Sequence, residues 1–152
     1  MTIEERLQRL EDIEAIRNLI SRYSPLTDSG QAEAVARIWT EDGEYDIGGF
    51  TVAKGRAAIS AAINSEPHRN LMESGSAHVL SSPHIELNGD NAVATCFSIL
   101  FRRQSEAFET YRVAASRWEL VRQADGEWLA TKRINRLLDG SDEARQILAA
   151  IA

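Results

Sequence analysis

The hydrophobic pattern changes its period near residue 76, and this change constrains the fold more than any other feature. Before it, apolar residues recur every three or four positions, which predicts amphipathic helices. After it, four segments rich in β-branched and aromatic residues predict strands, at residues 77–87, 92–103, 109–122 and 127–138. The turn sequences Asn88-Gly89-Asp90 and Ala124-Asp125-Gly126 predict hairpins. Helices followed by a meander of long strands predict an α+β fold, in which N-terminal helices cover a cone-shaped, curved, mostly antiparallel sheet.

The helical half begins with a long helix, expected over residues 3–23. One face of it carries the apolar stripe Ile3, Leu7, Leu10, Ile13, Ile16, Ile20 and Tyr23. Pro25 is expected to end or kink this helix, because proline has no amide hydrogen. The other expected elements are a second helix after Asp28 that includes Trp39, a strand and its return at residues 44–50 and 51–54, a third helix at residues 55–65 that Pro67 stops, a loop at residues 66–75, and a last helix at residues 141–151.

Composition limits the classes of function. The 152 residues, 43% of them hydrophobic, are enough to bury one core, so a single domain over residues 1–152 is expected. A formal charge of −6 without a basic stripe argues against nucleic acid and anionic membranes as partners. The one cysteine, the charged N-terminus and the lack of a long apolar run favour a cytoplasmic location.

Three residues suggest a site for proton transfer. His78 has the intrinsic basicity of a general base, and a carboxylate on one ring nitrogen would fix its tautomer. Asp28 is the candidate carboxylate, although with Gln31 it also forms the pattern of a helix capping box. Tyr23 continues the apolar stripe of the first helix, so its hydroxyl is either a satisfied core group or a hydrogen-bond donor in a cavity.

Arg136 is a fourth candidate, because simple alternation places it on the same face of the last strand as Trp128 and Ala130. A guanidinium there would suit an anionic group, although Lys132 shares the phase, and a strand end that reaches solvent or a salt bridge between subunits are the alternatives. His68 and His84 are both expected at the surface. The large apolar side chains expected to form pocket walls or ordinary core are Trp39, Phe50, Leu71, Met72, Phe97, Phe101 and Trp118. No histidine or cysteine spacing suggests a metal, and no motif implies a cofactor.

The chain also resembles a known superfamily. The sequence DIEAI in the first helix, a tryptophan in the second, His78, and a long final strand after Asp125-Gly126-Glu127-Trp128 resemble NTF2-like proteins over nearly the whole chain. Within them the chain is similar to the SnoaL-like branch, in particular to bile-acid 7-alpha-dehydratase, scytalone dehydratase and hexachlorocyclohexane dehydrochlorinase. This resemblance implies a cystatin-like α+β barrel.

The resemblance also implies site roles. Asp28 would orient His78, which would remove a proton from carbon, while Tyr23 and Arg136 would match a tyrosine and an arginine of these enzymes. Two features depart from the pattern: Pro25 interrupts the spacer, and the strand AVATCFSILF lacks the second pocket histidine of scytalone dehydratase.

Three functions follow as hypotheses. The first is a cofactor-independent lyase, such as a dehydratase, that acts on a small hydrophobic molecule, with cyclic compounds favoured. The second is a ketosteroid-isomerase-like isomerase that uses the same dyad. The third is a ligand-binding or scaffolding domain without catalysis. The open outer face of a curved sheet also predicts a homo-oligomer. The resemblance to the dehydratases implies a trimer, which is favoured over the dimer that other members of the superfamily imply.

Overall fold

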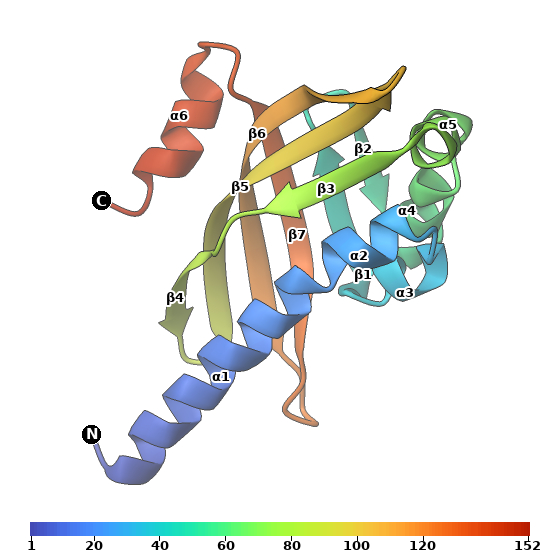
Figure 1. The fold of residues 1–152 in the computed structure, drawn as a ribbon. Coiled ribbons are helices and arrows are strands. Elements are labelled where there is room, and N and C mark those ends of the chain that lie inside the picture. Colours follow the sequence, from blue (N-terminus) through green and yellow to red (C-terminus); the bar gives the residue numbers. More distant parts are fainter.

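One curved, seven-stranded sheet organises the computed structural model, which describes residues 1–152 (Figure 1). The strand order is β2-β1-β7-β6-β5-β3, and β4 also pairs with β5. The strands are β1 (Trp39–Ile47), β2 (Thr51–Lys54), β3 (Ser76–Leu80), β4 (His84–Asn88), β5 (Asn91–Gln104), β6 (Ala107–Arg122) and β7 (Trp128–Leu137). All pairs are antiparallel except β1–β7. The predicted α+β architecture is therefore confirmed.

The helices are α1 (Ile3–Ser21), α2 (Tyr23–Asp28), α3 (Ala32–Ala36), α4 (Arg56–Ile63), α5 (Glu66–Ser74) and α6 (Asp142–Ala149). Helices α2 to α5 gather at one end of the sheet, and α6 lies on the other side (Figure 1). None of the helices combines the length and apolar character that a membrane span requires.

Helix α1 buries only the C-terminal part of its predicted stripe. Ile16 and Ile20 are buried in the core, whereas Ile3, Leu7 and Leu10 are exposed. The N-terminal turns project past the sheet, so they have no surface of this chain to cover (Figure 1). Helix α1 ends at Ser21, four residues before Pro25, as expected from the missing proline amide.

Asp12 of α1 is hydrogen-bonded to residues of the sheet. Its carboxylate is buried and accepts hydrogen bonds from the Trp128 indole at 3.0 Å and from Arg122 at 2.8 Å. A third bond comes from Gln8, one turn earlier in α1, at 3.2 Å. The buried charge is thus matched by three donors, as a buried carboxylate requires.

The Asp12→Ala variant is expected to lose about 2 to 3 kcal/mol of unfolding free energy, because it leaves the Trp128 N–H without its acceptor and leaves Arg122 with only the exposed Asp90 as a partner. The partial exposure of Arg122 and its second ion pair keep the loss below the usual range for broken buried pairs. Urea denaturation measures it, with the exposed Asp42→Ala as the control. Equal midpoints for the two variants would contradict this role of Asp12.

Two predicted elements are wrong in a way that matters for the site. Trp39 begins β1 and does not belong to a second helix, which is only the short α3. Residues 66–75 are largely helical and do not form a loop. Pro67 lies in the first turn of α5, where it does not interrupt the helix. A proline is well tolerated there, since the first amides of a helix have no partner anyway.

A β-bulge changes the phase of β7. Glu119 of β6 pairs with Lys132 and its neighbour Leu120 pairs with Ala130, so Thr131 is an extra residue. An extra residue turns every following side chain to the other face of the sheet. Trp128 and Ala130 face the core before the bulge, and Arg133 faces it afterwards.

Candidate active site

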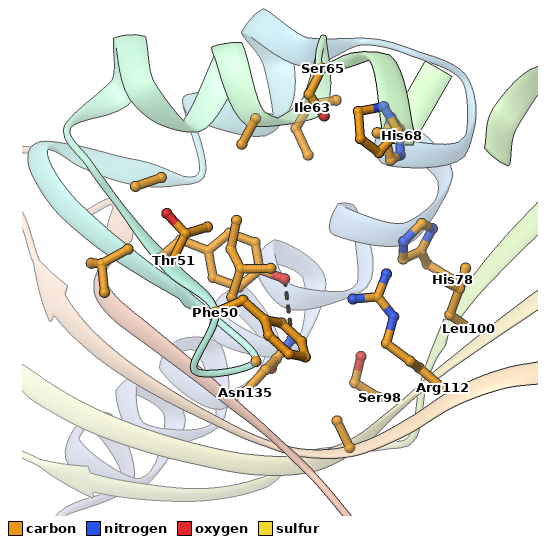
Figure 2. A pocket seen from close by; sticks show the side chains of 18 of the residues that line it. Phe50, Thr51, Ile63, Ser65, His68, His78, Ser98, Leu100, Arg112 and Asn135 are labelled. Carbon is orange, nitrogen blue, oxygen red and sulfur yellow. Dashed lines mark hydrogen bonds between the residues drawn. The ribbon is translucent and has the colours of Figure 1, made fainter. Parts of the chain in front are cut away.

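A cavity of about 750 Å³ lies between the concave face of the sheet and helices α4 and α5 (Figure 2). Of its 23 lining residues 14 are hydrophobic, which is typical of small-molecule sites. Two of the predicted wall residues, Phe50 and Leu71, line it, and so do Tyr23 and His78.

The other predicted wall residues lie elsewhere. Trp39 and Trp118 are fully buried beneath the cavity, with ring centroids 5.5 Å apart. Phe97 and Phe101 alternate along β5 with residues that line the cavity, so they point to the opposite face, where Phe97 is 43% exposed. Met72 packs against the turn at Gly30.

Asp28 and His78 form a tight pair at the cavity wall. Asp28 Oδ1 lies 2.6 Å from His78 Nδ1, and Asp28 Oδ2 accepts the His78 backbone N–H at 2.7 Å. Asp28 is the last residue of α2 and does not cap α3, whose N-cap is Gln31, so the capping-box prediction is wrong. Pro25 fits within α2 and leaves Asp28 directed at the histidine.

This pairing sets the tautomer of His78. An ionised carboxylate only accepts hydrogen bonds, so Nδ1 carries the proton of the neutral ring. The lone pair is then on Nε2, which makes no hydrogen bond within the protein, and the ring points into the cavity (Figure 2). The arrangement is that of a general base with its orienting carboxylate.

Tyr23 lies in a short chain of hydrogen bonds with Tyr45 and Asn135. The two phenol oxygens are 3.3 Å apart. The Asn135 amide donates to Tyr45 at 3.1 Å, the hydrogen bond drawn as a dashed line at Asn135 in Figure 2. One of the two hydroxyl protons makes the hydrogen bond between the phenols, so the second hydroxyl proton has no acceptor in the protein. Burial raises the pKa of Tyr45 far above its ordinary value, which keeps it protonated. The pair therefore offers one hydrogen-bond donor to the cavity.

Arg133 lies beneath these tyrosines and is fully buried. Its guanidinium stacks 4.1 Å from the Tyr23 ring centroid and 4.3 Å from that of Trp118, and it donates to Ser116 at 3.1 Å. One terminal nitrogen has no partner, and no carboxylate pairs with it. A buried cation without a counter-ion gives the cavity floor a positive potential.

Arg136, the predicted arginine, does not line this cavity. The bulge at Thr131 turns it to the other face, where it donates to Asp46 at 2.8 Å and to Glu143 at 3.0 Å. The hydrogen bond from Arg136 holds the pKa of Asp46 below its usual range. The alternative expected from the sequence was a salt bridge between subunits, whereas both acidic partners observed here belong to the same chain.

The Arg136→Met variant is therefore expected to change ligand affinity or turnover less than about threefold, while losing about 1 to 2 kcal/mol of stability at pH 7. Because the pKa of Asp46 is lowered by folding, this stability is present above its ordinary value of 3.8 and is lost as the pH falls below it. Urea denaturation at pH 7 and pH 3 measures the difference. A penalty that persists undiminished at acid pH would contradict the Asp46 pairing.

Besides Tyr45 and Asn135, sequence reasoning missed two further groups at the cavity. His68 was expected at the surface, but α5 directs it into the cavity, with its ring centroid 5.7 Å from that of His78. Burial, and secondly His78, lowers its pKa, so it is neutral at pH 7. Arg112 lines the cavity from β6 and gave no sequence signal beyond strand alternation.

His84 is exposed, as expected. No group of three possible metal ligands occurs.

Comparisons with known proteins agree with this architecture. A family model described as "SnoaL-like domain" matches residues 8–134. An NTF2-like protein with a cystatin-like fold from Novosphingobium aromaticivorans is 51% identical, with a TM-score of 0.93 over 96% of this chain and 94% of that one. A comparison with proteins of curated function gives no significant match.

Two more distant structures share the fold. A Catenulispora acidiphila protein in complex with S-DNPA is 22% identical, with a TM-score of 0.71 over 82% of this chain and 91% of that one. A proposed scytalone dehydratase from N. aromaticivorans is 21% identical, with a TM-score of 0.72 over 86% of each chain.

Proposed function

The chain belongs to the SnoaL-like domain family of NTF2-like proteins, and from this premise we propose that it is a cofactor-independent lyase acting on a small, hydrophobic, cyclic molecule. The observation that carries the proposal is the Asp28–His78 pair, with a free Nε2 at the wall of a large apolar cavity. A general base placed beside bound substrate is what abstraction of a carbon-bound proton requires.

The reaction would begin when His78 Nε2 takes a proton from a carbon next to a carbonyl group. The electron pair of the broken C–H bond moves onto the carbonyl oxygen and forms an enolate. The free proton of the Tyr23–Tyr45 pair and the field of Arg133 stabilise that negative charge. Arg133 thus takes the electrostatic role that simple alternation had assigned to Arg136.

The enolate then collapses, and a leaving group departs from the next carbon as a double bond forms between the two carbons. A hydroxide leaving group takes up the proton held by His78 and leaves as water, which restores the neutral ring. A halide departs as the anion and the proton passes to solvent. Asp28 stays ionised throughout and stabilises the imidazolium between the two steps.

An isomerase is the second candidate, because it shares the first step. The enolate is then reprotonated at another carbon, and the double bond moves without loss of a group. A purely scaffolding domain is less favoured, since the cavity is open to a ligand and the base is oriented within it. One structural neighbour is in complex with S-DNPA, which supports the binding of a small molecule by a protein of this fold.

Proton NMR in D₂O tests the proposal on a panel of cyclic ketones, with and without a β-hydroxyl or β-chloro group. The lyase predicts deuterium incorporation next to the carbonyl together with loss of the β-substituent. Exchange with movement of the double bond alone would favour the isomerase. Binding of panel members without exchange or elimination would favour a binding domain and contradict catalysis.

A further inference from the structure

The wall of the cavity has an unusual charge for this protein. The chain has 23 acidic and 17 basic residues, yet no aspartate, glutamate or lysine lines the cavity. Its one formally charged lining residue is the arginine Arg112. The cavity surface is therefore cationic in an otherwise acidic protein, which favours an anion over a neutral or cationic ligand.

Arg112 is held beside the proposed base by the sheet. His78 of β3 pairs with Leu100 of β5, and Leu100 pairs with Arg112 of β6, so the three residues form one row across the concave face. Figure 2 shows the His78 ring and the Arg112 guanidinium directed into the same end of the cavity. A ligand in contact with Nε2 of His78 would thus have its next group close to Arg112.

Arg112 is unlike the other partly buried arginines because no carboxylate neutralises it. Arg56, Arg117, Arg122 and Arg136 each form an ion pair with an aspartate or glutamate. Arg112 makes no ion pair and no hydrogen bond, and its guanidinium carbon lies 5.4 Å from the centroid of the Tyr111 ring. A guanidinium with five free donors at a cavity wall matches a planar anionic oxygen group.

Two further features reinforce this match. His68, at the same end, is a neutral imidazole because burial lowers its pKa, so it adds no negative charge that would repel an anion. The carboxylate of Asp28, bound to His78 through both oxygens, keeps its negative charge, but Arg133 adds a second cation beneath the floor, so the net charge at this end of the cavity stays positive.

We propose that the natural ligand is a hydrophobic anion whose carboxylate, or ionised phenol or enol oxygen, is held by Arg112. The inference rests on the proposed function only in assuming that the cavity takes a ligand. It adds the charge of that ligand, and it assigns the charge to a group other than the one that reacts at His78.

Isothermal titration calorimetry of the intact protein at pH 7 tests this with matched pairs. The acids benzoate, 2-naphthoate and 2-anthroate are each compared with the corresponding neutral amide. The anion 2,4-dinitro-1-naphtholate, which represents an ionised phenol, is compared with its neutral methyl ether. The best-fitting acid is expected to bind about tenfold to a hundredfold more tightly than its amide. A preference confined to the naphtholate would assign the phenol or enol class.

The Arg112→Gln variant is expected to bring acid and amide affinities within about threefold by weakening only the acid. Arg103→Gln, at an exposed arginine of the neighbouring strand, is the matched control and should keep the preference. The proposal is overturned if no anion binds more tightly than its neutral partner, or if Arg112→Gln keeps the preference. Both affinities are measured without turnover, so a failure here is distinct from a failure of the proposed catalysis.

Discussion

Replacing His78 by glutamine is expected to lower turnover of a substrate found in the NMR panel by about 10²- to 10⁴-fold. Glutamine is close to histidine in volume, and its amide can still donate to Asp28, so the wall keeps its shape. It has no basic nitrogen, however, and cannot take a proton from carbon. Deuterium incorporation next to the carbonyl should fall with the elimination rate, because both depend on the same proton transfer.

The exposed His84→Gln provides the matched control, since it removes the same imidazole outside the cavity. Its turnover should stay within about twofold of the parent protein. Circular dichroism and thermal unfolding verify that both variants fold. Full turnover by a folded His78→Gln protein would rule out His78 as the base and with it the proposed mechanism.

The sequence was most informative where one local pattern decided the structure. The change of hydrophobic period and the turns Asn88-Gly89-Asp90 and Ala124-Asp125-Gly126 predict the β4–β5 and β6–β7 hairpins that are observed. The pairing of Asp28 with His78, 50 residues apart, could not be obtained from local pattern. It was expected from the resemblance to SnoaL-like dehydratases, and the structure shows the contact.

The wrong predictions for the last strand and for residues 66–75 have physical reasons that no local sequence pattern reveals. The bulge at Thr131 reverses the phase of the last strand, so alternation assigned the inward place to Arg136 and not to Arg133. Pro67 was interpreted as a helix stop, although a proline equally suits a helix start. A helix stop at Pro67 places His68 in a surface loop, so the sequence predicts a cavity without this histidine.

The Asp28→Asn variant is expected to reduce turnover by about 10³- to 10⁴-fold, by reversing the tautomer of His78. In the parent protein one Asp28 oxygen accepts the His78 backbone N–H, and the other accepts from Nδ1. The backbone N–H remains a donor in the variant, so the asparagine oxygen must stay opposite it. The new NH₂ group then faces Nδ1 and needs a lone pair there, which moves the ring proton to Nε2.

A ring protonated on Nε2 has no lone pair directed at the substrate, so the variant keeps the histidine but loses the base. Nitrogen-15 NMR of the labelled imidazole reads this directly: the parent should carry its proton on Nδ1 and the variant on Nε2. The control Asp46→Asn makes the same change at a carboxylate outside the cavity and should leave both the His78 tautomer and turnover unchanged. If Asp28→Asn kept both the tautomer and the turnover, Asp28 would not be the group that orients the base. If the tautomer reversed and turnover stayed full, Nε2 would not be the atom that takes the proton.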